Sequence, residues 1–310
     1  MKKLSQSLYI KKSLFLHKIM ATISDFFQDP QYQKKFILEK LMQEFTGYTR
    51  EELRTHDQEE LSEEQTAKIK KAYQDYVIEK KPLEYVVGHV DFFGNPFFVN
   101  ENTLIPRPET EYMITAITEW IEEKKKKNAE HQTLLDIGTG CGVLGISVLL
   151  QNPQFFDQIF FCDISEGALK IAEKNYHNLI KEEYQTTFLT SNLTDFVKDF
   201  EGEEGNSVIL VANLPYIPEE TFDNNALETV QKREPRIAFV GGDDGLDLYR
   251  TMFHQIETHI QNKKLNPENL ELFLEMMTWQ VDILRKEFKN LTFEEVKTFH
   301  FNIRIVKTTF

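Results

Sequence analysis

The sequence predicts an α/β protein with a mostly parallel sheet and a small helical bundle in front of it. Apolar runs at residues 134–137 and 208–211 each lead into a turn of glycine or polar residues, which is typical of buried parallel strands. From residue 134 onward, strand patterns alternate with helical patterns, as they do in right-handed βαβ units. Residues 31–81, in contrast, show helical periodicity.

The helical bundle is predicted from an apolar stripe and two capping boxes. Apolar side chains recur at three- and four-residue steps and would share one helix face: Phe36, Ile37, Leu41, Met42 and Phe45. Two later helices are expected to start at Thr49-Arg50-Glu51-Glu52 and Ser62-Glu63-Glu64-Gln65. In each segment a hydroxyl and an acid or amide, three residues apart, can satisfy free backbone donors.

A β-hairpin is predicted between the bundle and the sheet. The apolar-rich residues 90–99 are interrupted by Gly94-Asn95-Pro96, which favours a turn. A helix is then expected to begin near Arg107-Pro108-Glu109, because proline is accepted in a first helical turn, and to end with the lysines at 124–127.

The remaining elements follow the βαβ pattern and then depart from it. Strands are expected at 134–137, 158–162, 208–211 and 270–275, helices at 145–150, 166–180 and 279–288, and two adjacent strands at 293–299 and 303–308.

Composition limits the function. With 310 residues, two domains are expected rather than one. A net charge of −14 argues against a protein that grips nucleic acid by its phosphates, and no direct nucleic-acid binding is expected. The two cysteines, Cys141 and Cys162, are too few for a disulfide framework, and the scattered histidines predict no metal site.

No targeting or membrane segment is expected. Lysines interrupt the apolar residues of positions 1–19, so no signal-peptide core forms, and no window has the length of a spanning helix. A cytoplasmic protein is therefore predicted. The leader is either a short extra helix or an upstream start before Met20.

A glycine turn after the strand at 134–137 predicts a nucleotide-sized crevice. Gly140-Cys141-Gly142-Val143-Leu144-Gly145 matches the dinucleotide pattern G-x-G-x-x-G, with Asp163 at about the expected spacing. Asp136, however, would repel a pyrophosphate at this turn. S-adenosyl-L-methionine carries cationic groups and no phosphate, so it is favoured over NAD, and Asp163 would accept both ribose hydroxyls. Asp136 and Asp163 could alternatively be helix caps.

The segment Asn213-Leu214-Pro215-Tyr216 predicts a site for an amino group. It places a side-chain amide and backbone carbonyls at the mouth of a buried strand. Asn213 Oδ1 and the Leu214 carbonyl could accept two N–H groups, Pro215 would shape the bend, and Tyr216 would cover a flat amide. Methyl transfer to a planar amino nitrogen is therefore expected. The alternatives are a turn role for Asn213 and a rim position for Tyr216.

These motifs, in this order, resemble the peptide chain release factor N5-glutamine methyltransferases, from about Phe36 to the C-terminus. The matching segments are Pro82-Leu83-Glu84-Tyr85, Arg107-Pro108-Glu109-Thr110-Glu111, residues 136–142, Asp163, residues 213–216, Glu234-Pro235-Arg236 and residues 241–245. Two departures from the family stand out. Leu214 replaces a proline, and Glu275-Met276-Met277 replaces Glu-x-Gly.

The resemblance implies a Rossmann-like class I methyltransferase sheet, mostly parallel with an antiparallel last strand. It also implies four regions: an N-terminal extension (1–30), a helical substrate-docking bundle (31–86), a β-hairpin linker (87–105) and an S-adenosylmethionine-dependent catalytic domain (106–310). The implied reaction methylates the N5 atom of the glutamine in the Gly-Gly-Gln motif of peptide chain release factors.

The resemblance also assigns site residues. Those expected at the cofactor are Asp136, Gly138, Thr139, Gly140, Cys141, Gly142, Asp163, Asn192, Leu193 and Asn213. Those expected to be catalytic and to bind substrate are Asn213, Leu214, Pro215 and Tyr216. Arg107 and Glu109 would line the substrate site or only orient the start of their helix, and Asn192 could have a plain loop role.

Three other functions remain open from the sequence. A relative that acts on a ribosomal-protein glutamine shares the Asn-Pro-Pro-Tyr type of motif. An adenine-N6 methyltransferase solves the same chemical problem but needs a basic groove and an extruded base, which the charge disfavours. A non-enzymatic binder of S-adenosylmethionine would be favoured if Leu214 abolished the grip on the amide.

Overall fold

A computed structural model describes residues 21–125, 132–200, 207–296 and 303–310. The chain divides into two compact units, Met1–Val87 and Gly88–Phe310, and each is described by itself. Three predictions lie outside the described residues: the leader before Met20, the lysines at 126–127 and the strand end at 297–299. None of the described helices is long and apolar enough to cross a membrane.

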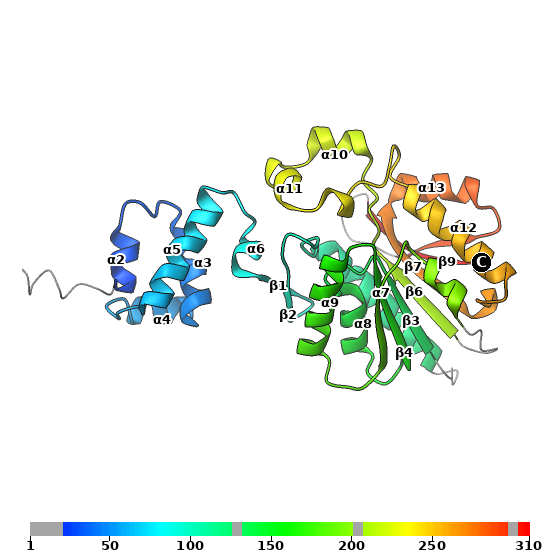
Figure 1. Cartoon of the computed structure of the whole chain (residues 1–310), viewed down its shortest axis with the longest axis horizontal. Helices are drawn as coiled ribbons and strands as arrows, with labels where there is room; N and C mark the ends of the chain where they lie inside the picture. Colours follow the sequence, from blue (N-terminus) through cyan, green and yellow to red (C-terminus); the bar gives the residue numbers. More distant parts are fainter. Residues whose placement is uncertain (1–20, 126–131, 201–206, 297–302) are drawn as a thin grey trace, which may run out of the picture. The chain divides into compact units, whose positions relative to one another are not determined.

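The first unit is helical, as predicted (Figure 1). Its helices are α2 (Ile23–Gln28), α3 (Lys35–Thr46), α4 (Arg50–Thr55), α5 (Glu63–Val77) and α6 (Leu83–Val87). Both predicted capping boxes are confirmed, because the hydroxyls of Thr49 and Ser62 accept from the backbone N–H groups of Glu52 and Gln65. These caps fix where α4 and α5 begin.

The predicted stripe on α3 is confirmed except for Phe36. Ile37, Leu41 and Met42 are buried in the core of this unit, and Phe45 packs against it. Phe36 is 67% exposed, so its assignment to the stripe was wrong. At 100° per residue, Phe36 lies on the side of the helix opposite the centre of the buried face. The same core includes residues of α2, which falls within the segment predicted as an N-terminal extension.

The second unit starts with the predicted hairpin, but the turn was predicted too late at Gly94-Asn95-Pro96, because Asn95 and Pro96 belong to the second strand. Strands β1 (His89–Phe92) and β2 (Asn95–Phe98) pair antiparallel, with Phe92 opposite Asn95. Phe93 and Gly94 form the two-residue turn, and both have positive φ angles, 48° and 77°. A turn of this type matches the natural twist of the two strands.

The main sheet has seven strands in the order β5-β4-β3-β6-β7-β9-β8. They are β3 (Gln132–Ile137), β4 (Gln158–Asp163), β5 (Gln185–Thr190), β6 (Ser207–Ala212), β7 (Leu270–Met277), β8 (Thr292–Val296) and β9 (Ile303–Thr309). β9 runs antiparallel to both of its neighbours, and the other described pairings are parallel. The predicted mostly parallel sheet with an antiparallel last strand is therefore confirmed. The edge strand β5 was not predicted.

Helices cover both faces of this sheet (Figure 1). One face packs against α7 (Glu111–Lys125), α8 (Val143–Gln151) and α9 (Glu166–Leu179), and the other against α12 (Asp247–Gln261) and α13 (Thr278–Glu287). The connection between β6 and α12 contains α10 (Glu219–Asn225), α11 (Glu228–Arg233) and η3 (Arg236–Ala238). The other 3-10 turns are η1 (Pro108–Thr110), η2 (Asp195–Asp199) and η4 (Pro267–Asn269). Helices α10, α11 and α12 were not predicted.

Helix α8 approaches the sheet so closely that it needs a glycine. A Cβ atom added to Gly145 would lie 2.7 Å from Asp136 Oδ2 and 2.7 Å from a ring carbon of Phe161. We expect Gly145→Ala to lower the free energy of unfolding by ~1–3 kcal/mol, because α8 must shift away from β3 and β4. Urea unfolding measures this change.

Ser147→Ala on the same helix is the matched control. Ser147 Oγ is buried and has no hydrogen-bond partner among the described residues, so its loss should be neutral or stabilising. Equal stability of the Gly145→Ala variant and the wild type would show that α8 tolerates a wider separation.

Candidate active site

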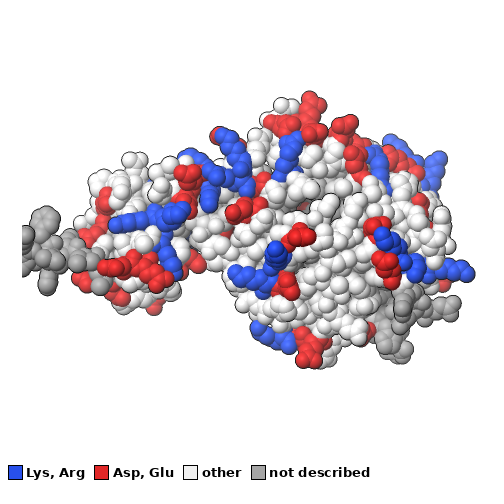
Figure 2. Space-filling view, viewed as in Figure 1, with Lys and Arg blue, Asp and Glu red and all other residues white. Residues whose placement is uncertain are grey.

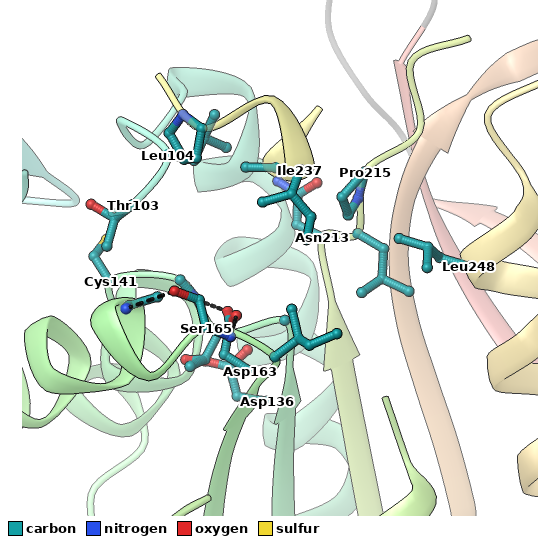
Figure 3. A pocket seen from close by; sticks show the side chains of 18 of the residues that line it. Thr103, Leu104, Asp136, Cys141, Asp163, Ser165, Asn213, Pro215, Ile237 and Leu248 are labelled. Carbon is teal, nitrogen blue, oxygen red and sulfur yellow. Dashed lines mark hydrogen bonds between the residues drawn. The ribbon is translucent and has the colours of Figure 1, made fainter. Parts of the chain in front are cut away.

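A pocket opens at the carboxyl ends of β3, β4 and β6 (Figure 3). The chain leaves β3 toward β4 on one side, whereas β6 lies on its other side, and ligands of open α/β sheets bind at such a switch point. The pocket encloses about 180 Å³. One water molecule needs only ~10–15 Å³, so there is room for a larger molecule.

The walls come from segments far apart in the sequence. They comprise residues 102–104, 138–141, 163–165, 191–193, 213–215, 235 and 237–238, with Asp136, Leu144, Ala168 and Leu248. In Figure 3, Ile237, Pro215 and Leu104 lie on one side of the cavity, and Asp136, Asp163 and Ser165 on the other.

The glycine turn forms the floor next to β3. Gly138 and Gly140 have φ angles of 68° and 58°, in the left-handed region that favours glycine. A Cβ atom on Gly138 would also lie 2.9 Å from Leu214 Cδ2, across the pocket floor. Of the predicted turn residues, Gly138, Thr139, Gly140 and Cys141 line the pocket. Gly142 does not; it is the N-cap residue of α8.

Asp136 stabilises the glycine turn through hydrogen bonds. Its Oδ2 atom accepts from Thr139 Oγ1 at 2.7 Å and from the Gly145 N–H at 2.9 Å, so it caps the first turn of α8. Asp136 is 1% exposed, and burial raises the pKa of its carboxyl to about 7. These contacts fit the alternative of a helix cap, and direct contact with a cofactor remains a prediction.

Asp163 joins the end of β4 to the glycine turn. Its two oxygens accept from the backbone N–H groups of Gly140 and Ser165, each at 2.9 Å. Burial raises the pKa of this carboxyl. A carboxylate has about four acceptor positions, so these two bonds leave capacity for ligand hydroxyls.

Asn192 and Leu193 also line the pocket. Their loop forms hydrogen bonds with Gln255 of α12. Gln255 donates from Nε2 to the Asn192 carbonyl at 3.2 Å and accepts from the Thr194 N–H at 2.9 Å. Leu193 itself has a φ angle of 54°. Gln255 was not predicted, because only the fold brings α12 to this loop.

Asn213 directly follows β6 and lines the pocket. Its Nδ2 donates to Thr110 Oγ1 at 3.0 Å, while Oδ1 accepts no hydrogen bond from the described residues. The Leu214 carbonyl lies 3.3 Å from the Tyr249 hydroxyl, which also makes a short hydrogen bond to the Glu275 carbonyl. A hydroxyl has one proton to donate, so the Leu214 oxygen keeps acceptor capacity.

Tyr216 points toward a buried carboxyl. Its hydroxyl donates to Glu275 Oε1 at 3.1 Å, and its ring is not among the residues that line the described pocket. Glu275 is 1% exposed, and burial raises the pKa of its carboxyl to about 7. Glu109 adds to this rise through its charge. The predicted role of Tyr216 over a substrate amide remains a prediction.

The glycine-rich segment at 241–245 packs behind residues 213–216. Cβ atoms on Gly241 and Gly245 would lie 2.3 Å from the Pro215 carbonyl oxygen and 2.1 Å from that of Tyr216. Gln280, which is fully buried, donates to the Tyr216 carbonyl at 2.8 Å. The close approach of the Pro215 and Tyr216 carbonyl oxygens explains why positions 241 and 245 are glycine. The sequence had matched them only as a family motif.

Arg107 and Glu109 do not line the described pocket. Arg107 pairs with the buried Glu234 at 2.7 Å, and Glu234 also accepts from the Ile105 N–H at 3.0 Å. These bonds tie residues 104–107 to the segment that begins at Pro235, and both segments contribute to the wall. The contacts of Arg107 fit the alternative in which it orients the helix start.

The chemistry of the lining suits a cationic or neutral ligand. Two carboxyls, Asp136 and Asp163, line the described pocket, and no lysine, arginine or histidine does. Cys141 and Cys162 are free and buried, and burial raises the pKa of each thiol to about 12. Among the residues with described positions, no group of three or more acidic, histidine or cysteine side chains could hold a metal ion.

Comparisons with known proteins identify relatives of this chain. A family model described as the methyltransferase small domain matches residues 118–232, and one described as the PrmC N-terminal domain matches residues 24–88. A release factor glutamine methyltransferase of Bacillus anthracis is 34% identical over 66% of this chain and 70% of its own length. One of Flavobacterium psychrophilum is 35% identical over 75% of this chain and 76% of its own length.

The chain belongs to the release factor glutamine methyltransferase family. The resemblance found in the motifs is thereby confirmed, and the protein is a methyltransferase. Among solved structures, the N-terminal domain of human METTL16 in complex with SAH matches with a TM-score of 0.48 and 13% identity, over 91% of this chain and 96% of the other. A ribosomal protein L11 methylase from Lactobacillus delbrueckii subsp. bulgaricus matches with a TM-score of 0.41 and 15% identity, over 65% and 79%.

The buried carboxyl of Glu275 predicts a pH-dependent stability. Its pKa in the folded chain is about 7, above the ordinary value of 4.5, so the unfolded chain ionises first as pH rises. Its contribution to stability is therefore complete below about pH 4.5 and is lost as pH rises through about 7. Glu275→Gln cannot ionise, so its melting temperature relative to wild type should rise between pH 5 and pH 8.

Thermal unfolding at both pH values measures this effect. Glu220→Gln on the exposed surface of α10 is the control and should show the same small difference at both. A difference between Glu275→Gln and wild type that does not change with pH would show that Glu275 ionises as easily in the folded chain as in the unfolded one.

Proposed function

We propose that the protein transfers a methyl group from S-adenosyl-L-methionine to the side-chain amide nitrogen (N5) of the glutamine in the Gly-Gly-Gln motif of peptide chain release factors. The observation that carries this proposal is the Asn213 carboxamide. Its Nδ2 is engaged by Thr110, and its Oδ1 is left free in a pocket whose described charged groups are carboxyls. The names of the family's relatives support the choice of substrate.

The pocket residues fit the methyl donor better than a dinucleotide. The glycine turn, Asp163 and the loop at Asn192 would hold the nucleoside, with Asp163 accepting from the ribose hydroxyls. A pyrophosphate would meet the carboxyls of Asp136 and Asp163 without a cation among the described lining residues. When bound, S-adenosylmethionine supplies a methyl group whose bond to sulfur breaks, with both electrons left on sulfur, as the bond to nitrogen forms.

The protein's task is to prepare the amide nitrogen. Its lone pair is delocalised into the carbonyl, so Asn213 Oδ1 and the Leu214 carbonyl would accept the two N–H groups and orient the remaining density. The nitrogen gains positive charge as the bond forms and then loses one proton to water. Fixed acceptor dipoles stabilise that charge. Alignment of the reacting atoms supplies much of the acceleration.

Leu214 can replace the family's proline in this role. The acceptor is the backbone carbonyl, which both residues provide. Proline would add stiffness, whereas Leu214 is held by packing: it is 2% exposed and its side chain lies against Gly138. Pro215 would shape the bend at the pocket wall. Tyr216, fixed by Glu275, would cover the substrate amide.

The helical unit would supply docking contacts for the protein substrate. We assign substrate docking to residues 31–86 together with α2, a linker role to the hairpin region 87–105, and catalysis to 106–310. On the face drawn in Figure 2, the described lysine and arginine side chains are interspersed with aspartate and glutamate. With a net charge of −14, this distribution favours a protein substrate over nucleic acid.

A labelling experiment tests the substrate. The purified protein is incubated with methyl-labelled S-adenosylmethionine and, separately, a release factor, ribosomal proteins and DNA. One methyl group should appear on the glutamine of the Gly-Gly-Gln motif, located by mass spectrometry, and replacement of that glutamine should abolish labelling. Label on a ribosomal protein or on DNA adenine, with the release factor unmodified, would contradict the proposed substrate but leave the reaction type standing.

Asn213→Ala tests whether Asn213 binds the amide of the substrate glutamine. It should lower kcat by at least ~10²-fold, because one preorganised polar contact to the reacting group is lost. Calorimetry with S-adenosylmethionine and thermal unfolding are the controls: the variant should stay folded and keep most of its affinity for S-adenosylmethionine. Turnover within a few-fold of wild type would remove Asn213 from the mechanism.

A further inference from the structure

The orientation of the Asn213 carboxamide requires its own explanation. The oxygen and the NH2 group of an asparagine have nearly the same shape, so a 180° flip costs little unless neighbours distinguish them. The carboxamide can accept a hydrogen bond from the substrate N–H group only when Oδ1 points toward the substrate nitrogen. The neighbours that distinguish the two ends lie on η1 and β7, outside the segment 213–216.

Sheet register brings Glu275 beside Asn213. Ala212, the last residue of β6, pairs with Leu274 of β7, so the next residues on each strand, Asn213 and Glu275, come level. Residues at equal register on neighbouring parallel strands point to the same side of a sheet. The 1% exposed carboxyl of Glu275 therefore faces the same region as the Asn213 carboxamide.

Thr110 is the direct partner of the carboxamide. It is 3% exposed, its N–H donates to the Arg107 carbonyl at 3.0 Å, and its Oγ1 lies 3.0 Å from Asn213 Nδ2. A hydroxyl can donate or accept, so Thr110 alone would tolerate either end of the carboxamide. A further group must decide which role the hydroxyl takes.

We infer that Glu275 determines whether the Thr110 hydroxyl donates or accepts in its contact with Asn213. Its Oε1 accepts from Tyr216, and its Oε2 is buried with no hydrogen-bond partner among the described residues. The Thr110 hydroxyl and the Asn213 amide face this carboxyl and counter part of the pKa rise that burial and Glu109 cause. In its ionised form, which predominates above the carboxyl's pKa of about 7, Glu275 can only accept, so it attracts the Thr110 proton and the Asn213 NH2 group and repels Asn213 Oδ1.

We propose that Thr110 and Glu275 are positioning residues that fix the Asn213 carboxamide, with Nδ2 turned toward them and Oδ1 toward the substrate nitrogen. This inference rests on the proposed role of Asn213 as the acceptor for the substrate amide. It assigns a function to Thr110 within Arg107-Pro108-Glu109-Thr110-Glu111 and to Glu275 in the buried part of β7. Neither residue lines the described pocket, so both act through Asn213.

Two substitutions of Thr110 separate positioning from packing. Thr110→Val keeps the branched shape and removes the hydroxyl, whereas Thr110→Ser keeps the hydroxyl and leaves a methyl-sized gap. Positioning predicts that Thr110→Val lowers kcat at least ~10-fold while the KM for the protein substrate changes less than ~3-fold. Thr110→Ser should stay within ~3-fold of wild type. A packing role predicts the reverse order.

Glu275→Gln provides an independent variant. Its amide NH2 group would face Asn213 Nδ2 and favour the flipped carboxamide, so kcat should fall at least ~10-fold. The affinity for S-adenosylmethionine, measured by calorimetry, should stay within ~3-fold of wild type in Thr110→Val and Glu275→Gln. That binding also shows that each variant is folded.

The outcomes distinguish this inference from the proposed function. If wild type is active and Asn213→Ala is not, but Thr110→Val and Glu275→Gln work at the wild-type rate, the positioning inference is overturned and the role of Asn213 stands. Equal loss in Thr110→Val and Thr110→Ser also overturns it, because the hydroxyl then makes no difference. If Asn213→Ala itself is fully active, the proposed function fails first.

Discussion

The site depends on the in-register hydrogen bonding of the parallel strands β3, β6 and β7. Ala212 pairs with Ile137 on one side and with Leu274 on the other, so Asn213 leaves the sheet level with Gly138 and Glu275. A shift of one residue in either ladder would turn these side chains to the opposite face. Backbone pairing in the core thus sets the relative positions of the glycine turn, the amide and the buried carboxyl, and the loops only add the outer walls.

Two buried carboxyls flank the central strand β6, Asp136 on β3 and Glu275 on β7. Asp136 holds the glycine turn and the first turn of α8, and Glu275 holds Tyr216. Each has a pKa raised to about 7 by burial, which means that the folded chain accepts an unfavourable ionisation at neutral pH. Groups that reduce stability in this way are concentrated at functional sites, where the order they impose outweighs their cost.

The sequence predicted the βαβ core and most pocket residues because their signals are local. A strand followed by glycines, as at residues 134–142, or by Asn213-Leu214-Pro215-Tyr216 can be recognised within a few positions. The sequence did not predict the roles of Thr110, Gln255 or Glu275, because these roles depend on contacts between elements that are distant in the chain. Helices α10 and α11, with 7 and 6 residues, are too short to show a clear apolar period. Helix α12 was missed although its buried residues Tyr249, Met252, Phe253 and Ile256 have helical spacing. Phe36 shows the converse error, an apolar residue placed in the core by spacing although it lies on the outer face.

The buried carboxyl of Glu234 connects two segments of the pocket's outer wall. Glu234 accepts from the Ile105 N–H and from Arg107, so it joins the segment after the hairpin to the one that continues through Pro235 to Ile237. Both segments line the pocket, and Ile237 is 60% exposed there. Glu234 and Arg107 belong to separate motifs, Glu234-Pro235-Arg236 and Arg107-Pro108-Glu109-Thr110-Glu111. Their pairing gives the two motifs a shared structural role, because each supplies one partner of the contact that joins the two wall segments.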